Sequence, residues 1–343
     1  MPHADVRRGA GLLVLLLIAG ACLGVAAREV AAQDDDPALA AAEAAFTSAE
    51  SDEERLAVVR EFLTAHPDHP QIAMVIRVGA ELMSGPMDDR AGAVELVETQ
   101  LAAIEDADTR RQVQEILLDL YGDPAYADKL AGLVAAMHGG AELTFVEHLE
   151  VIRVAAAAEV WHLVDEHSAA AAPRATAEAF RADYPDREYA DEEVAVAGRN
   201  RQGLLRTYAG WSAAGQGDAA RAFAEFEAAE DLLRKNYFGI PDNELYRYWG
   251  RTLAAHDRAD EGLEMLVRAW IHGADAAADA AAREVFTELG RDPQDYEDYV
   301  WSVRLAHARP VDDFVAADYG GSSHRFDELR GEKATLLAFW FPT

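Results

Sequence analysis

Two neighbouring stretches of similar length decide the fold. Residues 204–236 read LLRTYAGWSAAGQGDAARAFAEFEAAEDLLRKN, and residues 244–273 read ELYRYWGRTLAAHDRADEGLEMLVRAWIHG. At an offset of 40 residues, Gly210 aligns with Gly250 and Phe226 aligns with Leu266. Small residues at the turn (Gly215 and Gly217) and where the paired helices are expected to touch (Ala219, Ala222 and Ala229) allow two backbones to approach closely. Each stretch is therefore predicted to be a pair of helices joined by a short turn.

These stretches resemble the tetratricopeptide repeat, a pair of helices that stacks against its neighbours. The resemblance rests on Tyr208, Trp211, Gly217, Asp218, Ala222 and Phe226. The offset is longer than the period of about 34 residues that this family uses, which implies an extended loop near 237–241. Because each repeat buries its apolar face only against a neighbour, the array should fold as a block.

Helical signals continue upstream. Asp36-Pro37 is a helix start, and residues 51–54 form a capping box. A long helix is predicted from Thr144 to about Glu166. Apolar residues recur on single helix faces, at Leu56, Val59, Phe62 and Leu63, and at Val113, Ile116, Leu117 and Leu120. We expect a mainly α fold, with a helical-repeat domain over 33–309 whose clearest repeat pair is 201–273.

Composition excludes several classes of function. The chain has 343 residues, with 62 acidic against 31 basic side chains and a formal net charge of −31. Such a chain repels a phosphate backbone, so no nucleic-acid partner is expected. The excess of acid lies in the helical segment, where it indicates a solvated surface or a surface for a basic protein partner. A single cysteine, Cys22, excludes an internal disulfide and a cysteine zinc cluster.

The first 32 residues are predicted to be a secretory signal peptide. Two arginines precede an apolar run, and small residues suited to cleavage end at Ala27 and at Ala32. The alternative is an N-terminal membrane anchor. The segment ending at Cys22 resembles a bacterial lipobox, which implies lipidation of that cysteine. The preferred alternative is that Cys22 is a small apolar residue of a signal that is removed. We expect an exported protein of the periplasm or cell envelope, with no transmembrane span in the mature chain.

The helical segment offers few candidate sites. His66-Pro67-Asp68-His69 brings two imidazoles and a carboxylate into one turn, and we interpret it as a helix-ending turn. His162 and His167 are five residues apart, so they do not share a helix face, and we interpret both as surface residues. Five tryptophans recur along the helices and are interpreted as packing residues: Trp161, Trp211, Trp249, Trp270 and Trp301. No metal site, cofactor site or catalytic residue is predicted in this segment.

The pattern changes at Pro310. Residues 314–318 are predicted to be a short strand, and a turn follows at Gly320-Gly321. Residues 334–341 are continuously apolar, as is typical of a buried central strand. This segment resembles the opening of a thioredoxin-like domain of the TlpA-like and redoxin type, the superfamily of the AhpC/TSA antioxidant proteins. Residues 310–343 would be the first hairpin and one central strand of that α/β domain.

The resemblance implies thiol–disulfide exchange or thiol-dependent antioxidant chemistry on protein thiols or disulfides. In that family the strand ends Phe-Trp-x-x-x-Cys, and the cysteine opens a Cys-x-x-Cys pair. Trp340, Phe341, Pro342 and Thr343 would then flank the active site, with the first catalytic cysteine directly after Thr343. We therefore expect an inactive fragment of a redox enzyme that has a helical docking domain. The alternative is a non-catalytic secreted scaffold or lipoprotein whose helices bind protein partners.

Overall fold

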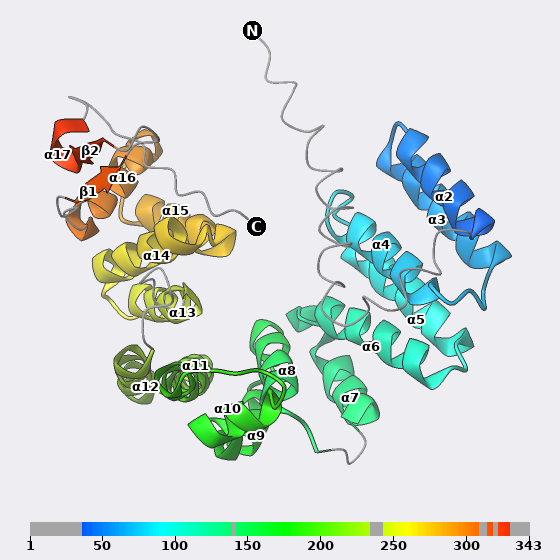
Figure 1. The fold of residues 1–343 in the computed structure, drawn as a ribbon, viewed down its shortest axis with the longest axis horizontal. Coiled ribbons are helices and arrows are strands. Elements are labelled where there is room, and N and C mark those ends of the chain that lie inside the picture. The colour runs from blue at the N-terminus through cyan, green and yellow to red at the C-terminus, as the bar shows by residue number, and fades with distance from the viewer. Residues whose placement is uncertain (1–35, 139–141, 234–242, 309–313, 318–321, 330–343) are drawn as a thin grey trace, which may run out of the picture. The chain divides into compact units, whose positions relative to one another are not determined.

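The computed structural model describes residues 36–138, 142–233, 243–308, 314–317 and 322–329, and it is mainly helical (Figure 1). The chain divides into two compact units, Met1–Glu188 and Tyr189–Thr343. The division falls inside the segment 33–309 that the sequence predicts to be a repeat domain. Among the described helices, none has the length and apolar character needed to cross a membrane.

The first unit is a succession of short helices. Neighbours along the chain pack together, as α2 does with α3 and α4 does with α5. The elements are α2 (Pro37–Ser48), α3 (Asp52–Ala65), α4 (Ile72–Ser84), α5 (Arg90–Ala103), α6 (Ala107–Leu120), η3 (Pro124–Tyr126), α7 (Ala127–His138), α8 (Phe145–Ala157), α9 (Trp161–Ala171), η4 (Ala172–Arg174) and α10 (Ala177–Asp183).

Local signals set the helix starts of this unit. The Asp36 carboxylate accepts hydrogen bonds from the amides of Ala38 and Leu39, and Ser51 Oγ accepts one from the Glu54 amide. The Glu54 carboxylate binds the Glu50 amide at 2.7 Å. The predicted apolar faces of 56–63 and 113–120 are buried. The sequence therefore predicted where α2 and α3 begin and which faces of α3 and α6 are covered.

The predicted long helix from Thr144 to Glu166 is wrong, because the chain breaks between α8 and α9. Glu159 has a φ of 58°, in the left-handed region, and the Val160 amide donates to the Ala155 carbonyl. A left-handed residue cannot continue a right-handed helix. The break turns the chain back, and α9 packs against α8.

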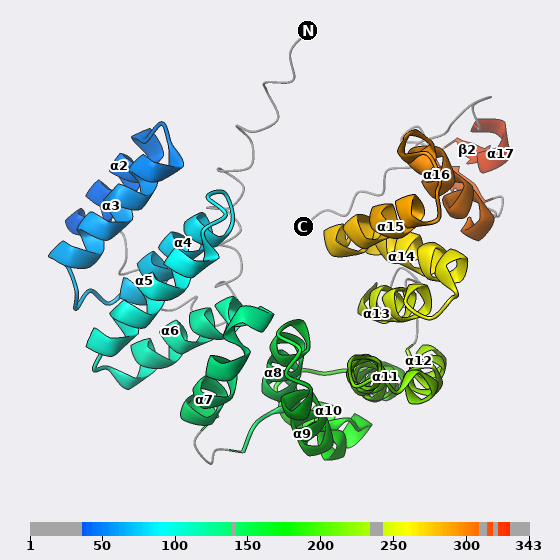
Figure 2. The same cartoon turned by 180° about the vertical axis from the view of Figure 1, so that it is seen from behind.

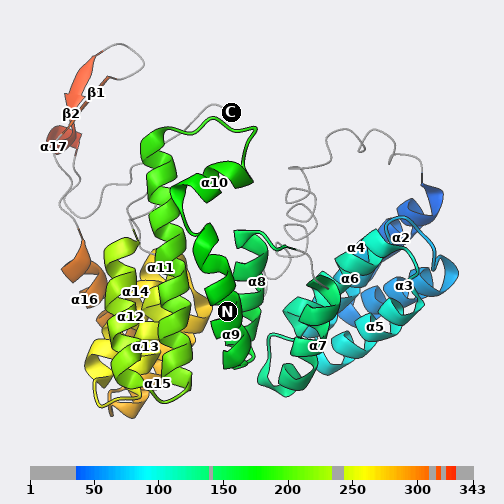
Figure 3. The same ribbon diagram turned by 90° about the horizontal axis from the view of Figure 1, so that it is seen from below.

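The second unit contains helices that pack in pairs. The closest pairs are α11 with α12 and α13 with α14, and α15 contacts α14 (Figures 1 and 2). Figure 3 shows α11, a helix of 25 residues, lying lengthwise beside α12. The elements are α11 (Asp191–Gly215), α12 (Ala219–Leu232), α13 (Asn243–Ala254), α14 (Ala259–Gly273), α15 (Ala276–Glu288), η5 (Pro293–Asp295), α16 (Tyr296–His307), β1 (Val315–Ala317), β2 (Ser323–Arg325) and α17 (Phe326–Leu329).

The residues that align at an offset of 40 occupy equivalent helix contacts. A Cβ atom added to Gly210 would lie 2.7 Å from the Phe226 ring, and one added to Gly250 would lie 2.9 Å from Leu266 Cγ. The turn after α11 passes through Gly217 at a φ of 82°, which favours glycine. The two stretches thus share one pattern of close helix packing.

A small antiparallel hairpin follows α16. β1 pairs with β2, with Val315 opposite Arg325 and Ala317 opposite Ser323. The ring of Phe314 stacks on that of Phe326 at 5.0 Å, and the Phe326 amide donates to the Phe314 carbonyl at 2.8 Å. The predicted strand over 314–318 is confirmed at its centre.

Several predictions concern residues outside the described ranges. These are the signal peptide over 1–32, the extended loop at 237–241, the turn at Gly320-Gly321 and the apolar strand over 334–341. All four stay predictions.

Candidate functional site

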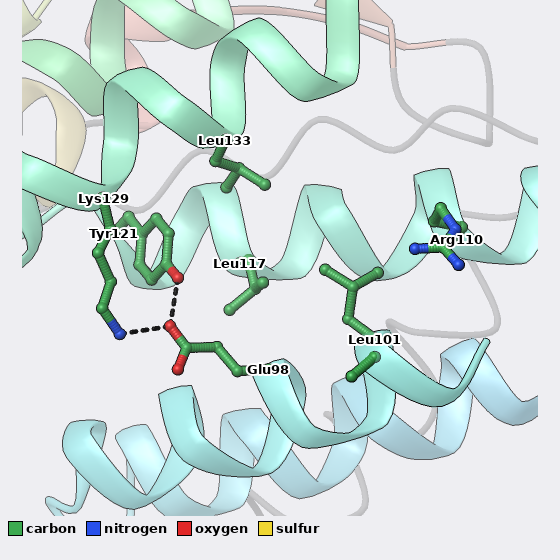
Figure 4. A pocket seen from close by; sticks show the side chains of 8 residues that line it. Glu98, Leu101, Arg110, Leu117, Tyr121, Lys129 and Leu133 are labelled. Atoms are coloured by element: carbon green, nitrogen blue, oxygen red, sulfur yellow. Dashed lines mark hydrogen bonds and ion pairs between the residues drawn. The ribbon is translucent and has the colours of Figure 1, made fainter.

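A pocket of about 360 Å³ lies between α5, α6 and α7 of the first unit (Figure 4). Leucine side chains from all three helices form its apolar wall. Polar groups gather at both ends in the view of Figure 4, with Glu98, Tyr121 and Lys129 at one end and Arg110 at the other. The lining residues are Glu98, Leu101, Ala102, Arg110, Leu117, Tyr121, Lys129 and Leu133.

Helix capping positions the polar lining residues. The Asp106 carboxylate accepts from the Thr109 amide at 2.8 Å and begins α6, so that Arg110 falls in its first turn. Arg110 Nη2 donates to the Ile104 carbonyl at the end of α5, which fixes the loop between the two helices. Tyr121 is the C-terminal cap residue of α6. The short connection through η3 then brings Lys129 back beside it.

Glu98 is the centre of the polar cluster. Its Oε1 atom accepts hydrogen bonds from the Tyr121 hydroxyl and from Lys129 Nζ, each at 2.5 Å. Burial alone would raise the pKa of Glu98. The hydrogen bonds from Lys129 and Tyr121 lower it by more, so the pKa of Glu98 lies below its ordinary value. Burial and the nearby carboxylate together raise the pKa of Tyr121. At neutral pH Glu98 is therefore a carboxylate and Tyr121 a neutral phenol.

Tyr121 also stacks on Tyr126, with ring centroids 5.6 Å apart. The Lys129 ammonium lies 5.8 Å and 6.0 Å from the two ring centroids. This is within reach of a cation–π interaction. Lys129 is thus held by one carboxylate and two aromatic faces.

Similar clusters recur in the second unit. The Tyr246 hydroxyl on α13 donates to Glu230 on α12 and accepts from Arg268 on α14, whose guanidinium lies 4.3 Å from the Tyr246 ring centroid. Burial is the largest cause that raises the pKa of Tyr246 to about 12. The Tyr296 hydroxyl on α16 donates to Asp279 on α15 at 2.8 Å, and Arg283 lies 4.1 Å from the Tyr296 ring centroid. We call these three groups the tyrosine–carboxylate clusters.

A second feature of that unit joins α11, α13 and the start of α15. The Trp211 ring on α11 stacks on the Tyr248 ring of α13, with centroids 4.8 Å apart. The centroid of the Tyr208 ring lies 5.7 Å from that of Tyr248. The Arg247 guanidinium lies 4.8 Å from the Tyr248 ring centroid, and its Nη1 atom is 2.8 Å from Asp275 Oδ2 at the start of α15. We call these five residues the aromatic ladder.

A buried pair of histidines joins α8 to α9. His148 Nδ1 and His167 Nδ1 are 3.1 Å apart, so one imidazole donates and the other accepts. Burial is the main cause that lowers the pKa of both residues. The interpretation of His167 as a surface residue is therefore wrong, whereas His162 is exposed. The spacing along one helix could not show that His167 meets a histidine from another.

The histidine turn predicted after α3 is confirmed as a turn. His66 ends α3, and His69 Nε2 lies 2.6 Å from Asp36 Oδ2. The bond from His69 is the main cause that lowers the pKa of Asp36. Throughout the described residues, His, Cys, Asp and Glu form no group of three or more that could hold a metal ion.

The tryptophans do not share one environment. Trp249 is buried, and Trp161, Trp211 and Trp270 are partly buried. The interpretation of Trp301 as a packing residue is wrong, because its side chain is 56% exposed on α16. Leu305, one helical turn further on, is 68% exposed. Helix α16 thus presents two exposed apolar side chains that periodicity alone would assign to a core.

The residues that the resemblances assign to function lie outside the described ranges. They are Cys22, Ala27 and Ala32 at the N-terminus, and Trp340, Phe341, Pro342 and Thr343 at the C-terminus. By contrast, the pocket was not predicted. Glu98 and Lys129 are 31 residues apart and come from different helices, so no local spacing points to their contact.

The chain was compared with protein-family models and with curated proteins. No protein-family model matches the chain, and no curated protein matches it at a significant level.

Proposed function

We propose that the helices are a protein-docking scaffold of an exported thiol–disulfide oxidoreductase of the thioredoxin-like, redoxin type. The observation that supports docking is the aromatic ladder. It places Tyr208 and Trp211 of α11 beside Arg247 and Tyr248 of α13. The two tyrosines are buried, whereas Trp211 and Arg247 are partly exposed and can reach a partner. These residue types are enriched where proteins bind one another, because they combine a large apolar surface with hydrogen-bonding groups.

The repeat resemblance strengthens this assignment. The equivalent contacts of Gly210 with Phe226 and of Gly250 with Leu266 are what two copies of one helical repeat would make. Stacked repeats present extended surfaces that suit protein ligands. We propose that α11–α14 are two tetratricopeptide-like repeats and that Trp211 and Arg247, the partly exposed side chains on α11 and α13 in the aromatic ladder, belong to their binding surface.

The docking role can be tested with a photo-crosslinking amino acid. We expect Trp211→p-benzoylphenylalanine to link to one recurring partner in cells, and Glu227→p-benzoylphenylalanine, exposed on α12, to give no such product. The purified partner should then bind the Trp211→Ala variant about tenfold more weakly, a typical loss for an aromatic interface residue. Equal crosslinking at both positions would refute docking at the ladder.

The redox role rests on the resemblance over residues 310–343, with support from the hairpin of β1 and β2 where that family has one. In the family, a thiolate at a helix N-terminus has a lowered pKa and attacks a disulfide, and a second cysteine resolves the mixed disulfide. Reading the gene beyond codon 343 tests this role. A Cys-x-x-Cys motif directly downstream is expected, and its absence would favour the non-catalytic scaffold.

Export is tested separately at the N-terminus. Mass spectrometry of the mature protein is expected to find a first residue at Arg28 or Gln33, as cleavage after Ala27 or Ala32 predicts. A first residue at a lipid-modified Cys22 would instead identify a lipoprotein. Retention of residues 1–32 would contradict the signal peptide.

A further inference from the structure

The pocket between α5, α6 and α7 has no part in the docking and redox roles proposed above. Its volume of about 360 Å³ falls in the range of small-molecule sites. Leu101, Leu117 and Leu133 supply an apolar wall from three different helices. A mostly apolar hollow with a few polar groups at its ends is the usual composition of a ligand site.

The charges of the lining select the class of ligand. Lys129 and Glu98 neutralise one another across 2.5 Å. Arg110 uses Nη2 for the Ile104 carbonyl, and no carboxylate pairs with it among the described residues. Its Nε and Nη1 atoms still carry N–H donors. The pocket is therefore locally cationic in a chain with twice as many acidic as basic side chains.

We propose that this pocket binds a small apolar molecule that carries one carboxylate. The carboxylate would accept charge-assisted hydrogen bonds from Arg110, and the apolar body would cover Leu101 and Leu117. A cationic ligand fits poorly, because the lining holds two cationic side chains, Arg110 and Lys129, against the single carboxylate of Glu98. A guanidinium is well suited to a planar carboxylate, which it can bind through two parallel N–H groups.

Octanoate is a suitable probe, with octan-1-ol and octylamine as neutral and cationic controls of equal chain length. Titration into the full chain, followed by ¹H–¹⁵N NMR, should move the amides of α5–α7 with a Kd of about 1 mM or tighter for octanoate. Octan-1-ol and octylamine should bind about tenfold more weakly, since each lacks the charge-assisted bond. Equal affinity of the three probes, or no octanoate shifts in α5–α7, would overturn the proposal.

Two variants test the position of the ligand. Arg110→Gln should weaken octanoate binding about tenfold, whereas Arg111→Gln removes the same charge outside the pocket lining and should leave the affinity within about twofold. Arg110→Gln also loses the bond to the Ile104 carbonyl, so a second variant keeps the test valid if it fails to fold. Ala102→Leu fills the pocket from an exposed helical position and should abolish the shifts. Unchanged affinity in Ala102→Leu would refute binding in this pocket.

Discussion

Gly250 on α13 lies directly against Gly262 on α14. A Cβ atom added to Gly262 would be 2.5 Å from the Gly250 carbonyl oxygen, and one added to Gly250 would be 2.9 Å from the Gly262 carbonyl oxygen. These neighbours are backbone atoms, which cannot move aside as a flexible side chain can. The two helices can be this close only because both positions lack a side chain.

Gly262→Ala is therefore expected to lower the free energy of unfolding by about 1–3 kcal/mol, the usual cost of overpacking. Chemical denaturation followed by circular dichroism measures it. Gly132→Ala is the matched control, because Gly132 lies inside α7 with no atom within 4 Å of an added Cβ. It should raise the stability by about 0.5–1 kcal/mol through helix propensity. Equal effects of the two variants would contradict the close packing.

The hydrogen bond from Tyr121 to Glu98 should contribute measurably to the first unit. Tyr121→Phe keeps the ring stack and removes the 2.5 Å bond, so we expect a loss of about 1 kcal/mol in the free energy of unfolding. Tyr126→Phe changes the ring that stacks on it and has no such bond to lose. It should cost less than about 0.5 kcal/mol. Thermal denaturation of both variants gives the comparison.

The buried histidine pair makes the first unit less stable in mild acid. Burial lowers the pKa of His148 and His167 below the ordinary histidine value of 6.5. As the pH falls through 6.5, these histidines therefore bind protons in the unfolded chain but not yet in the folded one. Stability is therefore present above that value and is lost as the pH falls toward the folded pKa. Arg174 and His138 act in the same direction, whereas Glu147 and Glu166 favour the charged forms.

Urea denaturation at pH 7.5 and pH 5.5 tests this dependence. The double variant His148→Gln, His167→Gln should lose less stability between the two pH values than the wild type does. His162→Gln, at an exposed position of α9, should keep the wild-type difference. A double variant with the same pH dependence as the wild type would show that the pair does not titrate on unfolding.

Arg247 and Asp275 should show a measurable interaction energy, because the side chains of this ion pair are only 21% and 12% exposed. A double-mutant cycle with Arg247→Gln and Asp275→Asn should give about 1–2 kcal/mol. Asparagine is chosen because Asp275 also caps α15 through the Ala278 amide and asparagine caps almost equally well. The same cycle on Arg258 and Glu261, which are 45% and 60% exposed, should give a much smaller coupling energy, because solvent screens an exposed pair.

Residues 1–343 should not reduce insulin disulfides. The single cysteine of the chain, Cys22, lies in the predicted signal peptide, so residues 1–343 lack the Cys-x-x-Cys pair that would attack a disulfide and resolve the product. Turbidity of insulin with dithiothreitol, with and without the protein, measures this activity. Turnover above the rate of dithiothreitol alone would show that our placement of the active site beyond Thr343 is wrong.

Much of the helical pattern could be predicted from the sequence, because its signals are local. Capping residues such as Asp36 and Ser51 act within one turn of the chain, and the apolar face from Leu56 to Leu63 repeats every helical turn. The sequence alignment also marked Gly210 and Gly250 as equivalent positions, and the structure places both at close helix contacts. The chain reverses direction at Glu159, where no proline or glycine marks the break. The apolar periodicity therefore predicted one continuous helix across this position.

The sites were harder to predict, since they depend on contacts between distant segments. His167 looked like a surface residue because its partner, His148, lies on another helix. The pocket joins Glu98 to residues on α6 and α7, and its leucines have ordinary core spacing in each helix separately. Only the packing of three helices shows that these side chains leave a space between them.

The tyrosine–carboxylate clusters have a consequence for how uniquely the helices are placed. Many of the helix contacts are made by alanine and glycine, whose low ridges leave rotation of a helix about its own axis weakly determined. A tyrosine hydroxyl that donates to a carboxylate on another helix is directional, so it fixes that rotation at Tyr121, Tyr246 and Tyr296. In an alanine-rich protein, these few polar bonds select one arrangement from several of similar compactness. Their loss would therefore broaden NMR signals before it reduced helical content.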